Sequence, residues 1–332
     1  MIKKYLTLLS LVFLVGFSHT VFSAETPFGQ RPEVRSFIKQ MVKKHHFKEA
    51  QLITVFNNVK IRHSITRSFH LQLEENPWYR YQMFFVTEWR IREGVRFWNE
   101  HKNVLERAEK TYGVPASLIV ATIGVETKYG HSTGGYRVID ALTNLAFGNS
   151  PRANFFKDEL EQFLLLSREQ HLDPLRVMGS YAGAIGQTQF MPSSYRHYAV
   201  DFSGDKHIDL SHNISDVIGS IANYYHKMGW AYSEPVAVQA SVAGYRYQSL
   251  LSSSDFVQVN NLSSYGIMPR EPVSPDQKAK LIALQGYFRN EYWLSFHNFD
   301  VIKKYNRSTL YAMAVYQLSE YISAVKGRLS NE

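Results

Sequence analysis

Ten residues from Ala116 to Val125 carry no charge and are mostly apolar, and Glu126 follows them directly. Pro115 stands just before this segment and suits the first turn of a helix. A helix that is apolar on nearly every side has to be buried in the core of a protein. The segment therefore predicts a central buried helix, around which the rest of the chain must pack.

Glu126 is the one acid of this predicted helix, and its spacing places it on a buried face. Ile119, Ile123 and Glu126 follow one another at i, i+4 and i+7. Burial raises the pKa of a carboxyl group, and so does a position in the last turn of a helix. A carboxylic acid that stays protonated near neutral pH can protonate a leaving group. The alternative is a structural ion pair with a basic residue such as Arg137 or Arg152.

The N-terminus has the pattern of a secretory signal peptide. Two lysines precede an apolar run from Tyr5 to Gly16, and small residues follow it. We expect a signal peptide over residues 1–23, with cleavage after Ser23 or, as a second choice, after Ala24. An uncleaved membrane anchor is the alternative, but the run is short for a span of about 20 residues.

Composition limits the class of protein. The 332 residues are 45% hydrophobic and 20% charged, which is typical of a globular chain with a substantial core. There is no cysteine, which excludes disulfides, thiol catalysis and a lipid anchor on a cysteine. The net charge of +8 includes Lys3 and Lys4 and is spread along the chain, whereas a nucleic-acid binder would concentrate it. We therefore expect a soluble periplasmic protein that does not bind nucleic acid.

Hydrophobic periodicity divides the rest of the chain into regions. Helical spacing predicts an N-terminal helical domain over residues 24–110 and a helical core over 111–235. Short alternating runs between Ser, Asn, Gly and Pro predict a small antiparallel β subdomain over 236–300. Residues 301–332 return to a helical pattern. The predicted fold class is mainly α, an α+β protein with a small β insertion.

A glycine-rich stretch, GSYAGAIGQTQFMPSSY, extends from Gly179 to Tyr195. It lacks the spacing of a dinucleotide-binding or phosphate-binding loop. Glycine allows a backbone to come close to a ligand or to a neighbouring helix. Uncharged amides, hydroxyls and aromatic rings beside such a backbone suit a neutral sugar. This stretch therefore predicts a carbohydrate site.

Together, GVETKYG and GAIGQTQFMPSSY resemble the lytic murein transglycosylases of the B type. The resemblance covers nearly all of the chain after the signal peptide and implies a lysozyme-like helical core that cleaves peptidoglycan strands. It also implies that Glu126 is the sole catalytic acid and base. The residue would protonate the oxygen between N-acetylmuramic acid and N-acetylglucosamine, and would then deprotonate the muramic C6 hydroxyl to give a 1,6-anhydro end. Most glycosidases use two carboxylates, but neither motif contains a second one.

The resemblance implies further contacts with the glycan. The residues that match the family's substrate-contacting positions are Ser180, Tyr181, Gln189, Phe190, Tyr224, Tyr305, Tyr311 and Arg152. Pro151 stands where the family has the first of two adjacent arginines, so only Arg152 of that pair is present. Structural alternatives remain open for these residues, since aromatic side chains also fill cores and Ser or Gln also caps helices.

The stretch DFSGDKHIDLSHNISD is similar to an EF-hand calcium loop. The predicted ligands are Asp201, Ser203, Asp205, His207 through its carbonyl oxygen, and Asp216 as a late closing carboxylate. Lys206 occupies the usual glycine position, and His212 stands in place of the bidentate glutamate. A structural calcium ion and a polar turn are alternative interpretations. The expected chemistry itself requires no cofactor.

Two other functions remain open from sequence. One is a muramidase that hydrolyses the same bond, and the other is a catalytically silent protein that binds the glycan. Peptidoglycan strands are the expected partner in each case, with cell-wall enzyme complexes as further candidates.

Overall fold

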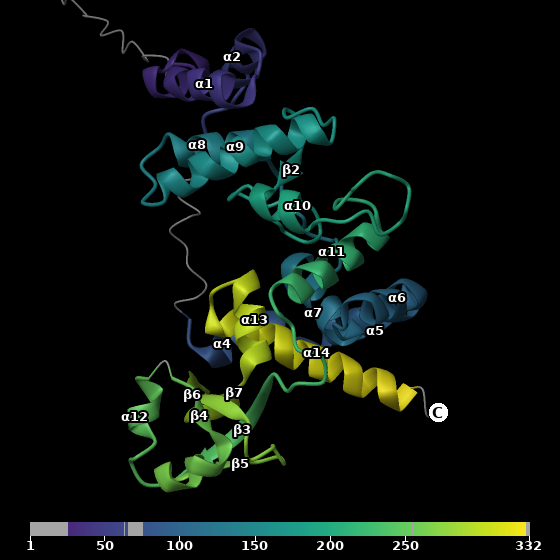
Figure 1. The fold of residues 1–332 in the computed structure, drawn as a ribbon, viewed down its shortest axis with the longest axis vertical. Coiled ribbons are helices and arrows are strands. Elements are labelled where there is room, and N and C mark those ends of the chain that lie inside the picture. The colour runs from purple at the N-terminus through teal and green to yellow at the C-terminus, as the bar shows by residue number, and fades with distance from the viewer. Residues whose placement is uncertain (1–25, 63, 66–75, 254, 330–332) are drawn as a thin grey trace, which may run out of the picture.

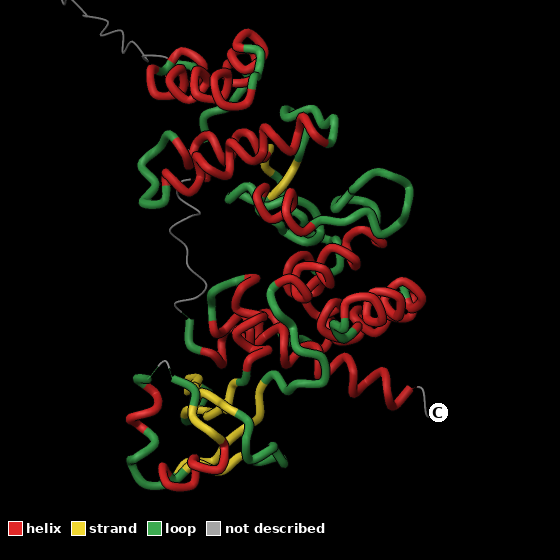
Figure 2. Tube along the Cα trace, in the orientation of Figure 1, coloured by secondary structure: helices red, strands yellow, loops and turns green. Residues whose placement is uncertain are grey.

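The computed structural model describes residues 26–62, 64–65, 76–253 and 255–329. The predicted signal peptide lies outside the described residues. The structure is mainly helical with a small antiparallel sheet at one end, which confirms the predicted fold class (Figures 1 and 2). No helix among the described residues has the length and apolar character that crossing a membrane requires.

The first part of the chain forms one 3-10 helix and several amphipathic α-helices. Their bounds are η1 Phe28–Gln30, α1 Pro32–His45, α2 Glu49–Asn57, α4 Trp78–Phe85, α5 Glu88–Glu100 and α6 Lys102–Tyr112. Helix α1 buries one face at amphipathic spacing, which contains Val34, Phe37, Ile38 and Met41. Helix α6 ends at Gly113, which adopts the left-handed conformation expected after a helix.

The central region surrounds the apolar helix. Its elements are α7 Ala116–Thr127, β1 Tyr136–Arg137, α8 Val138–Ala146, α9 Ala153–Glu169, β2 Met178–Gly179, α10 Pro192–Tyr198 and α11 Ile214–Lys227. In α7 every residue except Ser117 and Glu126 is buried. Helices α5, α6 and α11 pack against it, and so does the long C-terminal helix α14, Thr309–Leu329. The helix predicted from the opening apolar segment is therefore the centre of the fold.

A five-stranded antiparallel sheet lies beyond this core, in the order β4-β6-β7-β3-β5. Its elements are β3 Ala237–Val242, α12 Gln248–Leu251, β4 Val257–Gln258, η3 Val259–Tyr265, β5 Ile267–Pro269, β6 Lys278–Gln285 and β7 Asn290–Ser295. The sheet has a small hydrophobic core of its own, which includes Val238, Leu281 and Leu294. Helix α13, His297–Tyr305, then leads the chain back to the helical core (Figure 1).

Candidate functional site

Glu126 lies in the last turn of α7, where the sequence predicts it. Ile119 and Ile123, which share its face, are completely buried. The helix stops because Lys128 and Tyr129 both adopt left-handed backbone conformations, with φ of 53° and 59°. The glutamate therefore ends a rigid, buried element and is itself only partly exposed.

The Glu126 carboxyl group is held by one tyrosine from the C-terminal helix. The Tyr311 hydroxyl donates a hydrogen bond of 2.6 Å to Glu126 Oε1. Burial raises the pKa of Glu126 from 4.5 to about 7, and the hydrogen bond from Tyr311 opposes this rise. A large part of the Glu126 population is therefore protonated at neutral pH, as a general acid requires.

The structural alternative for Glu126 required a basic partner, and the described residues provide none. Arg137 pairs with Asp140 on α8, with 2.6 Å between Nη2 and Oδ1. Arg152 is exposed, and its guanidinium lies 4.2 Å from the centre of the Phe155 ring. The ring contacts of the Arg152 guanidinium thus lie on α9.

Aromatic candidates from separate elements meet beside Glu126. The rings of Tyr305 and Tyr311 stack with centroids 6.3 Å apart and an interplanar angle of 13°. Tyr305 also contacts Tyr224 at 4.8 Å and Phe190 at 5.7 Å. The Tyr305 hydroxyl donates to the carbonyl oxygen of Thr188 at 2.6 Å. Four of the predicted residues therefore form one aromatic cluster, which brings the glycine-rich stretch, α11, α13 and α14 together.

Two further tyrosines of this cluster were not among the predicted site residues. Tyr225 is fully buried, contacts Tyr305 at 5.5 Å, and shares a hydrogen bond of 2.9 Å with Thr122 of α7. Tyr198 contacts Tyr224 at 4.9 Å. For Tyr225 the available signal was its position next to Tyr224 in ANYYHK, since both residues lie on one buried helix.

Ser180 and Tyr181 lie where the glycine-rich stretch turns. The Ser180 hydroxyl accepts hydrogen bonds from the backbone N–H groups of Ala182 and Ala184, at 3.2 and 3.1 Å. This arrangement is a local turn and not a helix cap. Tyr181 is 38% exposed at the tip of the same turn.

Gln189 ties the glycine-rich stretch to the loop after α7. Its Nε2 donates to the carbonyl oxygens of Gly186 at 2.8 Å and Thr133 at 3.1 Å. Its backbone has a φ of 50°, which is uncommon for a residue other than glycine. The side chain therefore holds two loops beside the end of the Glu126 helix.

The predicted calcium loop keeps part of the expected backbone shape. Lys206, at the position usually taken by glycine, has a φ of 70°. Asp201 accepts backbone hydrogen bonds from Gly204 and Lys206, at 2.6 and 2.7 Å. Asp205 accepts one from the N–H of His207 at 2.9 Å. The carboxylates thus support a polar turn.

Asp216 has a different role from the predicted closing ligand. It is completely buried, its Oδ1 accepts from the N–H groups of Phe202 and Ser203, and its Oδ2 accepts from that of Asp209, all within 2.9 to 3.0 Å. Both oxygens hold the loop backbone. Across the described ranges, no three His, Asp or Glu side chains are grouped so that they could hold a metal ion. As arranged, Asp201, Asp205 and Asp216 are therefore not grouped as a set of metal ligands.

Comparison with known proteins identifies the family of this chain. The model of the transglycosylase SLT domain matches residues 29–320. Membrane-bound lytic murein transglycosylase B of Escherichia coli is 39% identical over 324 residues, which cover 95% of this chain and 89% of that protein.

Two solved structures share the fold over nearly their whole length. Soluble lytic transglycosylase SltB1 from Pseudomonas aeruginosa is 44% identical with a TM-score of 0.83, covering 89% of this chain and 100% of that one. Escherichia coli lytic transglycosylase Slt35 in complex with calcium is 39% identical with a TM-score of 0.82, covering 93% and 98%.

Proposed function

Because the chain belongs to the transglycosylase SLT domain family, we propose that it cleaves the β-1,4 bond between N-acetylmuramic acid and N-acetylglucosamine without water. The product would carry a 1,6-anhydro end. The observation that supports this most directly is Glu126, a buried carboxyl group with a pKa of about 7 at the end of α7. Such a group can give up a proton and take one back at neutral pH.

Glu126 acts first as the acid. Because Tyr311 donates to Oε1, the proton of the neutral carboxyl group resides on Oε2. Transfer of this proton to the glycosidic oxygen breaks the bond between that oxygen and C1 of the muramic residue. The carbonyl oxygen of the substrate's acetamido group forms a bond to C1 as the glycosidic bond breaks, and Tyr311 stabilises the carboxylate that remains.

Glu126 acts next as the base. The carboxylate takes the proton of the muramic C6 hydroxyl, and the C6 oxygen forms a bond to C1 while the bond from the acetamido oxygen to C1 breaks. Glu126 returns to its protonated state, so atoms and protons balance without consumption of water. One carboxyl group is sufficient for both steps because it alternates between the two forms.

Glycan contacts come from the residues around this carboxyl group. Tyr181 is exposed at the turn beside the cluster and can stack on a sugar ring. Ser180 and Gln189 shape the backbone. The Tyr305 ring stacks on Tyr311, and Phe190 and Tyr224 contact Tyr305 in turn. Arg152 is not included because its contacts are with α9.

The alternative functions are less consistent with this site. A glycosidase that uses water with two carboxylates needs a second acid near the first. The pKa of Glu126 is governed by burial and by Tyr311, and no other carboxylate among the described residues contributes. A silent binding protein would retain a buried acid without an ionic partner, which costs stability and brings no benefit to binding.

The proposed location is the periplasm, with peptidoglycan strands as the partner. The predicted signal peptide and the absence of cysteine support export without a lipid anchor. The mechanism uses no metal ion. The Slt35 structure contains calcium, but here Lys206 replaces the glycine and Asp216 binds backbone. An ion bound in this loop would affect the stability of the loop.

Mass spectrometry of the fragments released from purified peptidoglycan tests the proposal. We expect anhydro-muramyl products from the wild-type protein and none from Glu126→Gln. Glu88→Gln is the matched control, because Glu88 is an exposed residue of α5 in a surface ion pair with Arg92. Reducing-end products would indicate a muramidase instead. Equal turnover by Glu126→Gln would exclude the assigned acid.

A further inference from the structure

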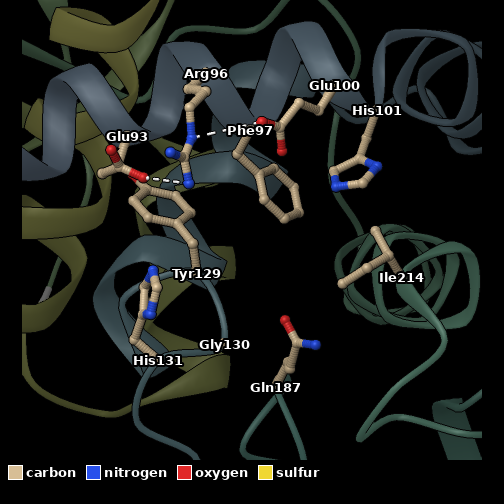
Figure 3. Close-up of a pocket in the computed structure, with 10 residues that line it drawn as sticks. All are labelled: Glu93, Arg96, Phe97, Glu100, His101, Tyr129, Gly130, His131, Gln187 and Ile214. Carbon is tan, nitrogen blue, oxygen red and sulfur yellow. Dashed lines mark ion pairs between the residues drawn. The ribbon is translucent and has the colours of Figure 1, made fainter.

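A cavity lies near α7, and Glu126 is not among the residues that line it. It has a volume of about 340 Å³ and is enclosed by α5, the residues after α7, the glycine-rich stretch and the start of α11 (Figure 3). This volume is within the range of about 300–1,000 Å³ that is typical of small-molecule sites. The proposed mechanism uses none of its side chains.

A buried acceptor without a partner lies on its wall. Gln187 is 7% exposed, and its Oε1 has no hydrogen-bond partner in the part of the chain that the structure describes. Its Nε2 donates to the carbonyl oxygen of Ser211 at 3.2 Å, which fixes the orientation of the amide. If the Gln187 amide were flipped, Oε1 would face the carbonyl oxygen of Ser211, and two acceptors would meet. The atom without a partner is therefore Oε1 and not Nε2. A buried polar atom of this kind calls for an explanation, such as a ligand.

The backbone around Gln187 keeps this oxygen in place. The Gln187 N–H donates to the carbonyl oxygen of Leu210 at 2.7 Å. Gly130 has a φ of 85°, and a side chain there would come within 2.8 Å of Gln187 Oε1. Glycine at position 130 therefore allows the backbone to lie close to this oxygen. The acceptor is held rigidly, and Figure 3 shows it directed toward the cavity.

The charges of the cavity favour a cation. Arg96 of α5 pairs with Glu93 at 2.9 Å and with Glu100 at 3.5 Å, so two carboxylates share one guanidinium (Figure 3). These three side chains carry a net charge of −1. Burial lowers the pKa of His101, which favours the neutral form of that ring. The groups left for a ligand are mainly acceptors, which suits a ligand that donates hydrogen bonds.

Aromatic faces complete the site. Phe97 and Tyr129 lie 5.6 Å apart and both line the cavity. Trp89 continues this row outward, with its ring 6.4 Å from that of Tyr129 and 5.9 Å from that of His131. Aromatic faces attract cations as well as alkyl groups.

We propose that this cavity binds a compact ligand through a primary ammonium group, which donates to Gln187 Oε1 and lies against Phe97 and Tyr129. The net negative charge beside it compensates the charge of the ligand. The ammonium can belong to a free alkylamine or to a lysine-like side chain of a peptide. This site is separate from the Glu126 site and does not depend on the proposed reaction.

Calorimetric titration with n-pentylammonium tests the site, with n-pentanol and N-acetylglucosamine as neutral probes. We expect only the ammonium to bind, with NMR shifts at Gly130 and His131. Gln187→Leu removes the acceptor and should weaken binding about tenfold or more. Glu100→Gln retains Gln187 and should weaken binding by a few fold, with a smaller salt dependence. Glu126→Gln should leave the affinity unchanged.

A peptide with a blocked N-terminus and one lysine separates the two sources of the ammonium. Binding of this peptide indicates a peptide ligand, and binding of the alkylamine alone indicates a free amine. Three results would overturn the proposal: no ammonium binding to the wild type, equal binding of n-pentanol or of the sugar, or an unchanged affinity in both Gln187→Leu and Glu100→Gln. Circular dichroism of each variant verifies the fold.

Discussion

Tyr311 sets the pKa of Glu126 together with burial, and the two act in opposite directions. Burial raises the pKa of the carboxyl group to about 7, whereas the hydrogen bond of 2.6 Å from Tyr311 favours its charged form. Replacing Tyr311 with phenylalanine removes this hydrogen bond but keeps the ring. We expect the pKa of Glu126 to rise by about one unit, since a hydrogen bond to a charged group contributes roughly 1.5–3 kcal/mol.

The pH profile of kcat/KM measures this effect. Its alkaline limb reports the loss of the acid proton from the free enzyme, so the limb should move to higher pH in Tyr311→Phe. Tyr305→Phe is the matched control, because the Tyr305 hydroxyl donates to Thr188 and not to Glu126. A lower rate with an unmoved limb in Tyr311→Phe would show that this hydroxyl does not control the ionisation.

The sequence alone predicted the catalytic candidate better than its surroundings. Glu126 could be singled out because its face and its helix end follow from local periodicity. Glu126 and Tyr311 are 185 residues apart in the sequence, so no local sequence pattern can predict that they are in contact. The contacts of Asp216 could not be predicted for a related reason, because a carboxylate that binds three backbone N–H groups cannot be distinguished in sequence from one that binds a metal ion.

At the scale of the elements, α5 and α7 are joined by a close contact through glycine. A side chain at Gly124 would come within 2.5 Å of the Tyr129 hydroxyl, which donates to the carbonyl oxygen of Arg90 at 2.7 Å. Arg90 in turn donates through Nε to the carbonyl oxygen of Gly124 at 3.0 Å. This interlocked contact fixes the position of the helix that ends at Glu126.

We expect Gly124→Ala to destabilise the fold, although alanine is the better helix former. Overpacking of a tight contact costs about 1–3 kcal/mol, which exceeds the gain of about 1 kcal/mol from helix propensity. Gly327→Ala is the control, because Gly327 lies in α14 with no atom within 4 Å of an added side chain. That variant should be slightly more stable than the wild type. Urea unfolding compares the two, and equal stabilisation by both would contradict the tight contact.

The helices were more predictable than the strands. The buried face of α1 and the limits of α7 and α10 follow from apolar spacing and proline positions. The run DFVQVNN has the alternating pattern of a strand. Only its residues Val257–Gln258 pair, with β6, and residues 259–265 form a 3-10 helix. Strand pairing depends on a distant partner, which an alternating pattern does not identify.

At the scale of the whole molecule, two hydrophobic cores are connected through α13 and α14. Tyr316 of α14 donates to the carbonyl oxygen of Ala237 in β3 at 2.6 Å, and its ring contacts Trp293 of β7. Lys280 of β6 pairs with Asp300 of α13 at 2.7 Å. The same C-terminal helix supplies Tyr311 to Glu126, so the sheet and the candidate site are attached to one rigid element.

The ionisation of Glu126 should make the stability of the whole fold depend on pH. The folded pKa of about 7 lies above the ordinary value of 4.5, so the folded state holds the proton more tightly than the unfolded state does. The free energy of unfolding should therefore fall as pH rises from about 4.5 to 7, by roughly 3 kcal/mol in total. Glutamine at position 126 cannot ionise, so Glu126→Gln removes this pH dependence of the free energy of unfolding.

The measurement is the urea unfolding free energy of wild type and Glu126→Gln at pH 5 and pH 8. The variant should be more stable than the wild type at pH 8, and its advantage there should exceed that at pH 5 by roughly 2–3 kcal/mol. Glu88→Gln provides the baseline, because Glu88 is exposed and pairs only at the surface. A constant difference between wild type and Glu126→Gln at both pH values would mean that burial does not raise the pKa of Glu126. The general-acid assignment would then lose its physical basis, because an acid that is fully ionised at neutral pH has no proton to give to the glycosidic oxygen.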